Sequence, residues 1–84
     1  MIKKDMYFKH NASAYRAKWQ AFFHVLKKDK EKDCYICNSI EILPNNMVRF
    51  SVRASRHKCV LTKEISKDTY EQERNRAYEI LANI

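Results

Sequence analysis

Residues 40–53, which read Ile-Glu-Ile-Leu-Pro-Asn-Asn-Met-Val-Arg-Phe-Ser-Val-Arg, predict a β-hairpin. Side chains alternate between the two faces of a strand, so Val48, Phe50 and Val52 share one face. Arg49 and Arg53 share the other face. The Pro-Asn-Asn segment predicts the turn, because proline presets φ and asparagine tolerates left-handed geometry. We expect the apolar face to pack on helices and the basic face to meet solvent or a partner.

All three cysteines of the chain lie at the two ends of this hairpin. Cys34 and Cys37 precede it, and Cys59 follows it, two residues after His57. Three thiolates and one imidazole are a common tetrahedral set for a structural Zn²⁺ ion. His57 and Cys59 share an ion only if a strand carries both on one face. The hypothesis is therefore a structural zinc that joins the two ends of the hairpin.

Three other interpretations of these residues remain open. Free cysteine is among the most buried residue types, so each thiol could be part of the core. A disulfide between Cys34 and Cys37 would suit a redox protein, although such motifs usually begin a helix next to a βαβ unit. His57 could also belong to the basic run around it and have no metal role.

A helix is predicted to begin near Asn11, because Asn11 or Ser13 can serve as its N-cap and several alanines follow. Its apolar residues recur at helical spacing. We interpret this stripe as core, with a stacking platform for bases as the alternative. The helix is predicted to fray in the alternating-sign tract 27–33. The stripe consists of Tyr15, Trp19, Phe22 and Leu26.

A second helix is predicted at the C-terminal end, beginning at Ser66 or at Asp68, which has Glu71 three residues on as a weak capping box. Its apolar stripe consists of Tyr70, Ala77, Leu81 and Ile84. A short third strand is predicted from Cys59 to Thr62. The expected fold is thus a single α+β domain over 1–84, with an N-terminal helix, a β-hairpin with a short third strand, and a C-terminal helix, clipped by structural zinc.

The composition excludes several classes of enzyme site. The 84-residue chain contains no glycine, which P-loops, dinucleotide-binding fingerprints and nucleophile elbows all require. Three cysteines with one histidine suggest a closed metal sphere with no position for a catalytic water. We see no general base with an orienting partner, so we expect no enzymatic activity.

The charge distribution favours an anionic partner. The net charge is +7, and residues 47–63 carry five basic side chains and no acid. Such an asymmetry favours nucleic acid, RNA or DNA, bound through phosphate contacts without sequence readout. The leading prediction is a small, non-catalytic, zinc-stabilised nucleic-acid-binding module. The residues predicted to bind are Arg49, Arg53, Arg56, Lys58, Lys27 and Lys28.

The alternative is a small regulator or inhibitor that binds a larger host protein complex, possible for a factor encoded by a virus or mobile element. Such an adaptor should expose an aromatic anchor, for instance Tyr7, Phe8 or Tyr78. No segment approaches the ~20 apolar residues of a membrane span, so no membrane partner is expected. An odd number of cysteines and the lack of an export signal predict a cytoplasmic location.

Overall fold

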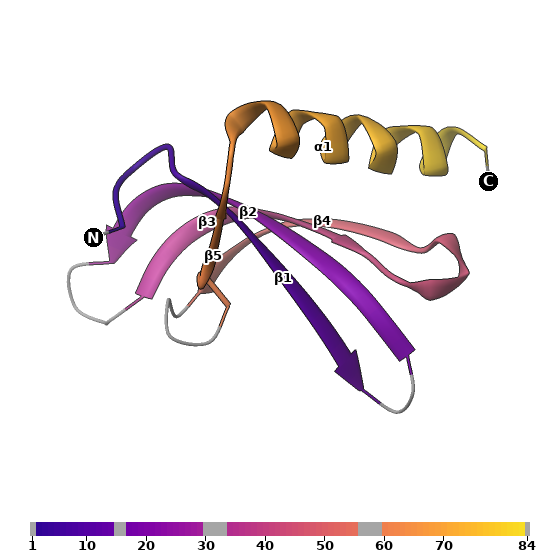
Figure 1. The fold of residues 1–84 in the computed structure, drawn as a ribbon, viewed down its shortest axis with the longest axis horizontal. Helices are drawn as coiled ribbons and strands as arrows, with labels where there is room; N and C mark the ends of the chain where they lie inside the picture. The colour runs from indigo at the N-terminus through magenta and orange to yellow at the C-terminus, as the bar shows by residue number, and fades with distance from the viewer. Residues whose placement is uncertain (1, 15–16, 30–33, 56–59, 84) are drawn as a thin grey trace.

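The computed structural model describes residues 2–14, 17–29, 34–55 and 60–83. In these ranges the chain forms one antiparallel five-stranded sheet with the order β4-β3-β2-β1-β5, and a C-terminal helix lies across one face of it (Figure 1). The elements are β1 (Tyr7–Ala14), β2 (Ala17–Asp29), β3 (Cys34–Ile42), η1 (Pro44–Asn46), β4 (Val48–Ser55), β5 (Lys63–Ile65) and α1 (Lys67–Ala82).

The predicted N-terminal helix is wrong. β1 and β2 instead form an antiparallel hairpin whose paired positions run from Tyr7 opposite His24 to Ala14 opposite Ala17. β2 lies in the middle of the sheet, so both of its faces meet apolar surroundings. Apolar residues on both faces hide the two-residue period of a strand and leave a spacing that imitates a helix.

The sheet carries a separate core on each face. On the face covered by α1, which we call the helix-side face, Phe22 packs with residues of β3 and of the helix. On the opposite, helix-free face, Phe23 packs in a second cluster, covered in part by Ile2, Met6 and Val60. Adjacent side chains of a strand point to opposite faces, so Phe22 and Phe23 contribute to different cores. The helix-side core contains Phe22, Ile40, Ile42, Tyr70 and Ala77, and the other contains Phe8, Ala21, Phe23, Val25, Tyr35, Cys37 and Leu61.

A β-bulge interrupts β2 between Val25 and Lys27, where the register with β3 shifts. Leu26 is the extra residue, so its place in the apparent helical stripe came from an irregularity of the strand. The N-terminal segment pairs with the chain here, since the Asp5 N–H donates to the Val25 carbonyl at 2.9 Å and the Val25 N–H donates to the Met6 carbonyl at 2.9 Å. The bulge thus lies where the N-terminal segment joins the sheet.

The hairpin predicted at 40–53 is confirmed. β3 and β4 pair from Tyr35 opposite Ser55 to Ile42 opposite Val48. The turn has positive φ at Asn45 (70°) and Asn46 (59°), the left-handed geometry that asparagine tolerates. The predicted third strand is wrong in position, because the described residues 60–62 are not in a strand and β5 begins at Lys63. β5 pairs with β1, so β5 and β4 form the two opposite edges of the sheet.

The C-terminal helix is also confirmed, with Ser66 as its N-cap. The Ser66 side chain accepts a hydrogen bond from the Thr69 N–H at 3.0 Å, which satisfies one of the amides left unpaired at the helix start. Tyr70 and Ala77 are buried against the sheet, whereas Leu81 is exposed. No helix in the described part of the chain is long and apolar enough to cross a membrane.

Candidate nucleic-acid interface

A hollow of about 510 Å³ opens on the helix-free face. Trp19 and His10 lie on its β1–β2 side, and Arg49, Arg53 and Glu41 lie on its β3–β4 side. This volume is within the range of about 300–1,000 Å³ that is typical of small-ligand sites. The remaining lining residues are Ala21, Phe23, Ala54, Ser55 and Val60.

The hollow follows from one row of cross-strand neighbours. His10 pairs with Ala21, Ala21 with Glu41, and Glu41 with Arg49. Residues directly opposite each other in antiparallel strands point to the same face, so these four side chains form a continuous row across four strands. Ala21 is the smallest member and lies in the middle, between larger side chains. The row therefore leaves a depression over Ala21, with a cationic group at one end.

An ion pair places one of the two predicted arginines. The Arg53 Nη1 lies 2.7 Å from the Glu41 Oε1, and the Glu41 side chain is only 10 % exposed, against 54 % for Arg53. The basic tract is free of acids along the chain, but β3 brings a carboxylate into contact with it. The positive face is therefore weaker around Arg53 than the sequence indicated, while Arg49 is exposed at the end of the row.

The predicted binding residues do not all share a surface. Arg49 and Arg53 lie on the helix-free face. Lys28 pairs with Tyr35, a member of the core on that face, whereas Lys27 pairs with Ile36, so the two lysines point to opposite faces. Arg56 and Lys58 lie outside the described residues.

The structure places Cys34 and Cys37 in a strand and not in a turn that would direct both thiols at one ion. Both are buried free cysteines in β3, and residues three apart on a strand point to opposite faces. Among the described residues, no group of three His, Cys, Asp or Glu side chains could hold a metal ion. The predicted fold was therefore wrong to include a zinc site within the described residues. His57 and Cys59 lie outside the described residues, so any zinc they bind stays a prediction.

Cys37 is the most enclosed of the described thiols, with no exposed surface. Burial raises the pKa of its thiol from 9.0 to about 11. Between these values the unfolded chain loses a proton that the folded chain keeps, so we expect the free energy of unfolding to fall by about 1–2 kcal/mol as pH rises from 9 to 11. Urea unfolding at several pH values measures this loss.

Tyr70 contributes to the same measurement, because burial also raises the pKa of its phenol and so also lowers stability at alkaline pH. The difference between wild type and Cys37→Ala isolates the cysteine. A thiol reagent should react slowly with Cys37 in the folded protein. Full and rapid labelling without denaturant, or an unchanged pH slope in Cys37→Ala, would contradict the burial of this thiol.

A second polar cluster lies around His24 on the helix-side face of the sheet. The His24 Nε2 lies 2.8 Å from the Asp5 Oδ1, and this hydrogen bond lowers the pKa of the Asp5 carboxyl. The His24 ring stacks on Tyr7 with a centroid distance of 4.6 Å, and Tyr70 meets both rings. The cluster fastens the N-terminal segment and α1 to β2.

The sequence analysis placed Trp19 in a helical core stripe, with base stacking as the alternative, and gave His10 no role in the site. The signal that could have placed Trp19 is the alternation of Trp19, Ala21, Phe23 and Val25, which puts it on the helix-free face with the arginines.

Comparison with family models, with curated proteins and with solved structures found no match.

Proposed function

We propose that this protein binds single-stranded nucleic acid, without catalysis, on the helix-free face of its sheet. The observation that carries the proposal is the hollow over Ala21, which has aromatic rings on one side and arginines on the other. Proteins that bind single strands combine aromatic side chains, on which bases stack, with positive charge that follows the backbone.

Each wall of the hollow suits one part of a nucleotide. Trp19 is partly buried, so its ring is held in place and yet keeps a surface for a base. Arg49 and Arg53 offer planar guanidinium groups, which pair well with phosphate. Glu41 orients Arg53 through their ion pair. A net charge of +7 adds a long-range attraction for any polyanion.

Trp19→Leu should weaken binding of a fluorescein-labelled oligonucleotide by about 5- to 150-fold, the equivalent of losing one stacked base. Leucine keeps the apolar character of the position but has no ring. Fluorescence anisotropy with RNA and DNA strands measures the affinity. Trp19 is the only tryptophan in the chain, so quenching of wild-type fluorescence reports contact at the hollow directly.

Arg49→Gln should reduce the slope of log affinity against log salt by about 0.7, the value for one phosphate contact to a single strand. The control is Arg76→Gln, which removes the same charge from α1 on the other face of the sheet, where Arg76 pairs with Glu73. Equal effects of the two arginine variants would indicate nonspecific attraction to a basic protein. Retention of a protein partner from lysate, with no nucleic acid bound by wild type at low salt, would favour the adaptor hypothesis.

A further inference from the structure

β4 forms an edge of the sheet, because it pairs with β3 and has no neighbour on its outer side among the described strands. The strand is eight residues long, contains no proline, and pairs with β3 without a register shift. Proteins usually keep their edge strands short, interrupt them with a bulge or cover them, since the unpaired amides and carbonyls of an edge can pair with another strand. This edge has the regular backbone that strand addition requires.

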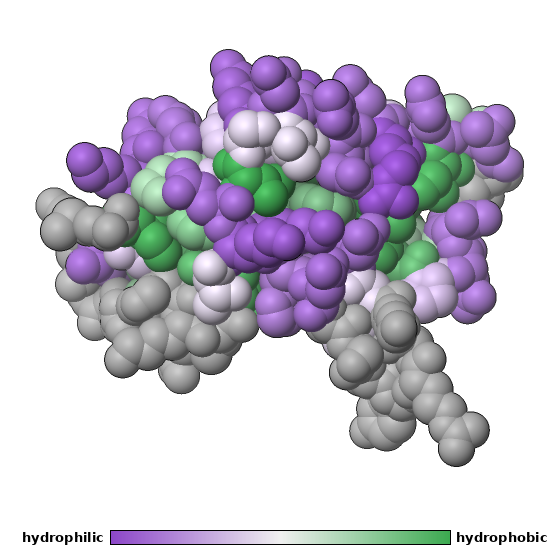
Figure 2. Space-filling model, viewed as in Figure 1, coloured by the Kyte–Doolittle hydropathy of each residue, from purple (hydrophilic) through white to green (hydrophobic). Residues whose placement is uncertain are grey.

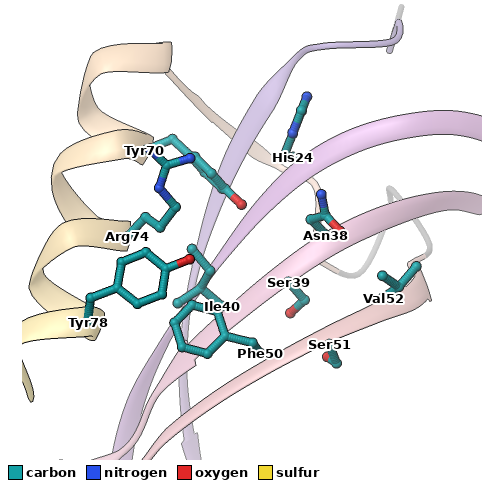
Figure 3. Close-up of a pocket in the computed structure, with 10 residues that line it drawn as sticks. All are labelled: His24, Asn38, Ser39, Ile40, Phe50, Ser51, Val52, Tyr70, Arg74 and Tyr78. Atoms are coloured by element: carbon teal, nitrogen blue, oxygen red, sulfur yellow. The ribbon is translucent and has the colours of Figure 1, made fainter. Parts of the chain in front are cut away.

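A groove of mixed character accompanies this edge on the helix-side face, lined by apolar residues of β4 and α1 and also by polar residues such as Asn38 and Arg74. α1 contacts β4 as well as the central strands, but it does not cover the edge fully, since Phe50 is 40 % exposed, Val52 65 % and Tyr78 54 %. The Phe50 and Tyr78 rings stack with a centroid distance of 5.2 Å, and the groove between helix and strand has a volume of about 450 Å³ (Figure 3). Figure 2 shows that the outward surface of α1 is mostly polar, in purple.

The two faces of β4 define the chemistry of an added strand. Its side chains would alternate between the groove and the helix-free face. Those entering the groove would meet Phe50, Val52 and Tyr78, and so should be mainly apolar, with Arg74 as a charged group in the same lining. Those on the other face would lie beside Arg49, which is exposed, and Arg53, which already pairs with Glu41. The position beside Arg49 in particular should therefore be acidic. The edge thus matches an extended segment that alternates apolar residues with Asp or Glu.

A second copy of this chain fits the edge poorly. Antiparallel pairing of two β4 strands about Ser51 would place Arg49 of one copy opposite Arg53 of the other. Like charges directly opposite each other are destabilising, and each copy also carries a net charge of +7. In this register charge complementarity therefore favours an acidic partner over self-association.

We propose that β4 accepts, as a sixth strand, an extended segment of a partner protein in which apolar and acidic residues alternate. Main-chain hydrogen bonds would supply affinity, and the groove beside Tyr78 would supply specificity. Of the three aromatic anchors expected for an adaptor, Tyr78 is exposed, Phe8 is buried, and Tyr7 stacks on His24. This protein-binding edge shares Arg49 and Arg53 with the nucleic-acid proposal, but it uses the groove beside Tyr78 and does not use Trp19.

The test uses a nine-residue peptide in which glutamate alternates with valine and phenylalanine. Isothermal titration measures its affinity, and amide hydrogen exchange of the full protein locates it. Binding should slow amide exchange in β4. Of two peptides that are N-methylated at alternate amides, one at the odd and one at the even positions, only the one whose methyl groups face β4 should lose binding. A peptide with lysine in place of glutamate should bind at least tenfold more weakly.

Phe50→Thr should weaken peptide binding about tenfold or more, and Val52→Thr, which keeps the shape of valine, serves if the first variant is unstable. The matched control is Leu81→Gln, which removes an apolar side chain of 41 % exposure that does not line the groove. Trp19→Leu should leave peptide affinity unchanged, so failure of either proposal is distinguishable. Equal binding of the lysine peptide, unprotected β4 amides, or a dimer formed through β4 without peptide would overturn the inference.

Discussion

Phe22→Ala is expected to lower the free energy of unfolding by about 3–5 kcal/mol, the usual cost of truncating a buried phenylalanine. Phe22 is 1 % exposed and lies in the central strand, between Ile40 and the residues of α1. Its removal leaves a cavity that the rigid sheet cannot close. Because small domains have only about 5–15 kcal/mol of stability, the variant should be largely unfolded or close to it.

Trp19→Ala is the comparison that makes this prediction specific. The helical interpretation gave Trp19 and Phe22 equal weight as core residues, whereas the structure leaves Trp19 partly exposed at the rim of the hollow. We therefore expect a clearly smaller loss for Trp19→Ala. Urea unfolding followed by far-ultraviolet circular dichroism measures both variants without the tryptophan signal. Similar losses for the two would restore the helical stripe and argue against β2.

Arg53→Gln is expected to cost about 1.5–3 kcal/mol, the range for losing a hydrogen bond to a charged group. The substitution leaves the Glu41 carboxylate, which is 10 % exposed, without the guanidinium 2.7 Å away. Arg49→Gln removes the same charge from the same strand without breaking that ion pair, and should cost much less.

A double-mutant cycle with Glu41→Gln measures the coupling directly. The double variant should recover part of the stability lost in Arg53→Gln, because no charge is then left unpaired. Additive losses would show that the ion pair contributes nothing. Both arginines are exposed as expected, but this coupling means that reversing the charge of Arg53 is not a neutral probe of ligand binding.

The local features of this chain were predictable where one face of an element is buried and the other is not. The 40–53 hairpin alternates clearly, and its asparagine turn has the positive φ values expected. The C-terminal helix begins at one of the two predicted residues, since a serine N-cap is a local signal. The same alternation places the apolar residues of β4 on one face and its arginines on the other. The apolar residues are Val48, Phe50 and Val52.

Tertiary structure alone decided the central strand and the candidate site. β2 has α1 on one side and the residues around Met6 and Val60 on the other, so both of its faces are apolar and its period is hidden. The contact between Glu41 and Arg53 and the row from His10 to Arg49 depend on strand register, which joins residues distant in sequence. The sequence by itself determined which residues alternate, cap and turn, because those preferences act within a few residues. Which strands became neighbours was decided by packing across the whole sheet.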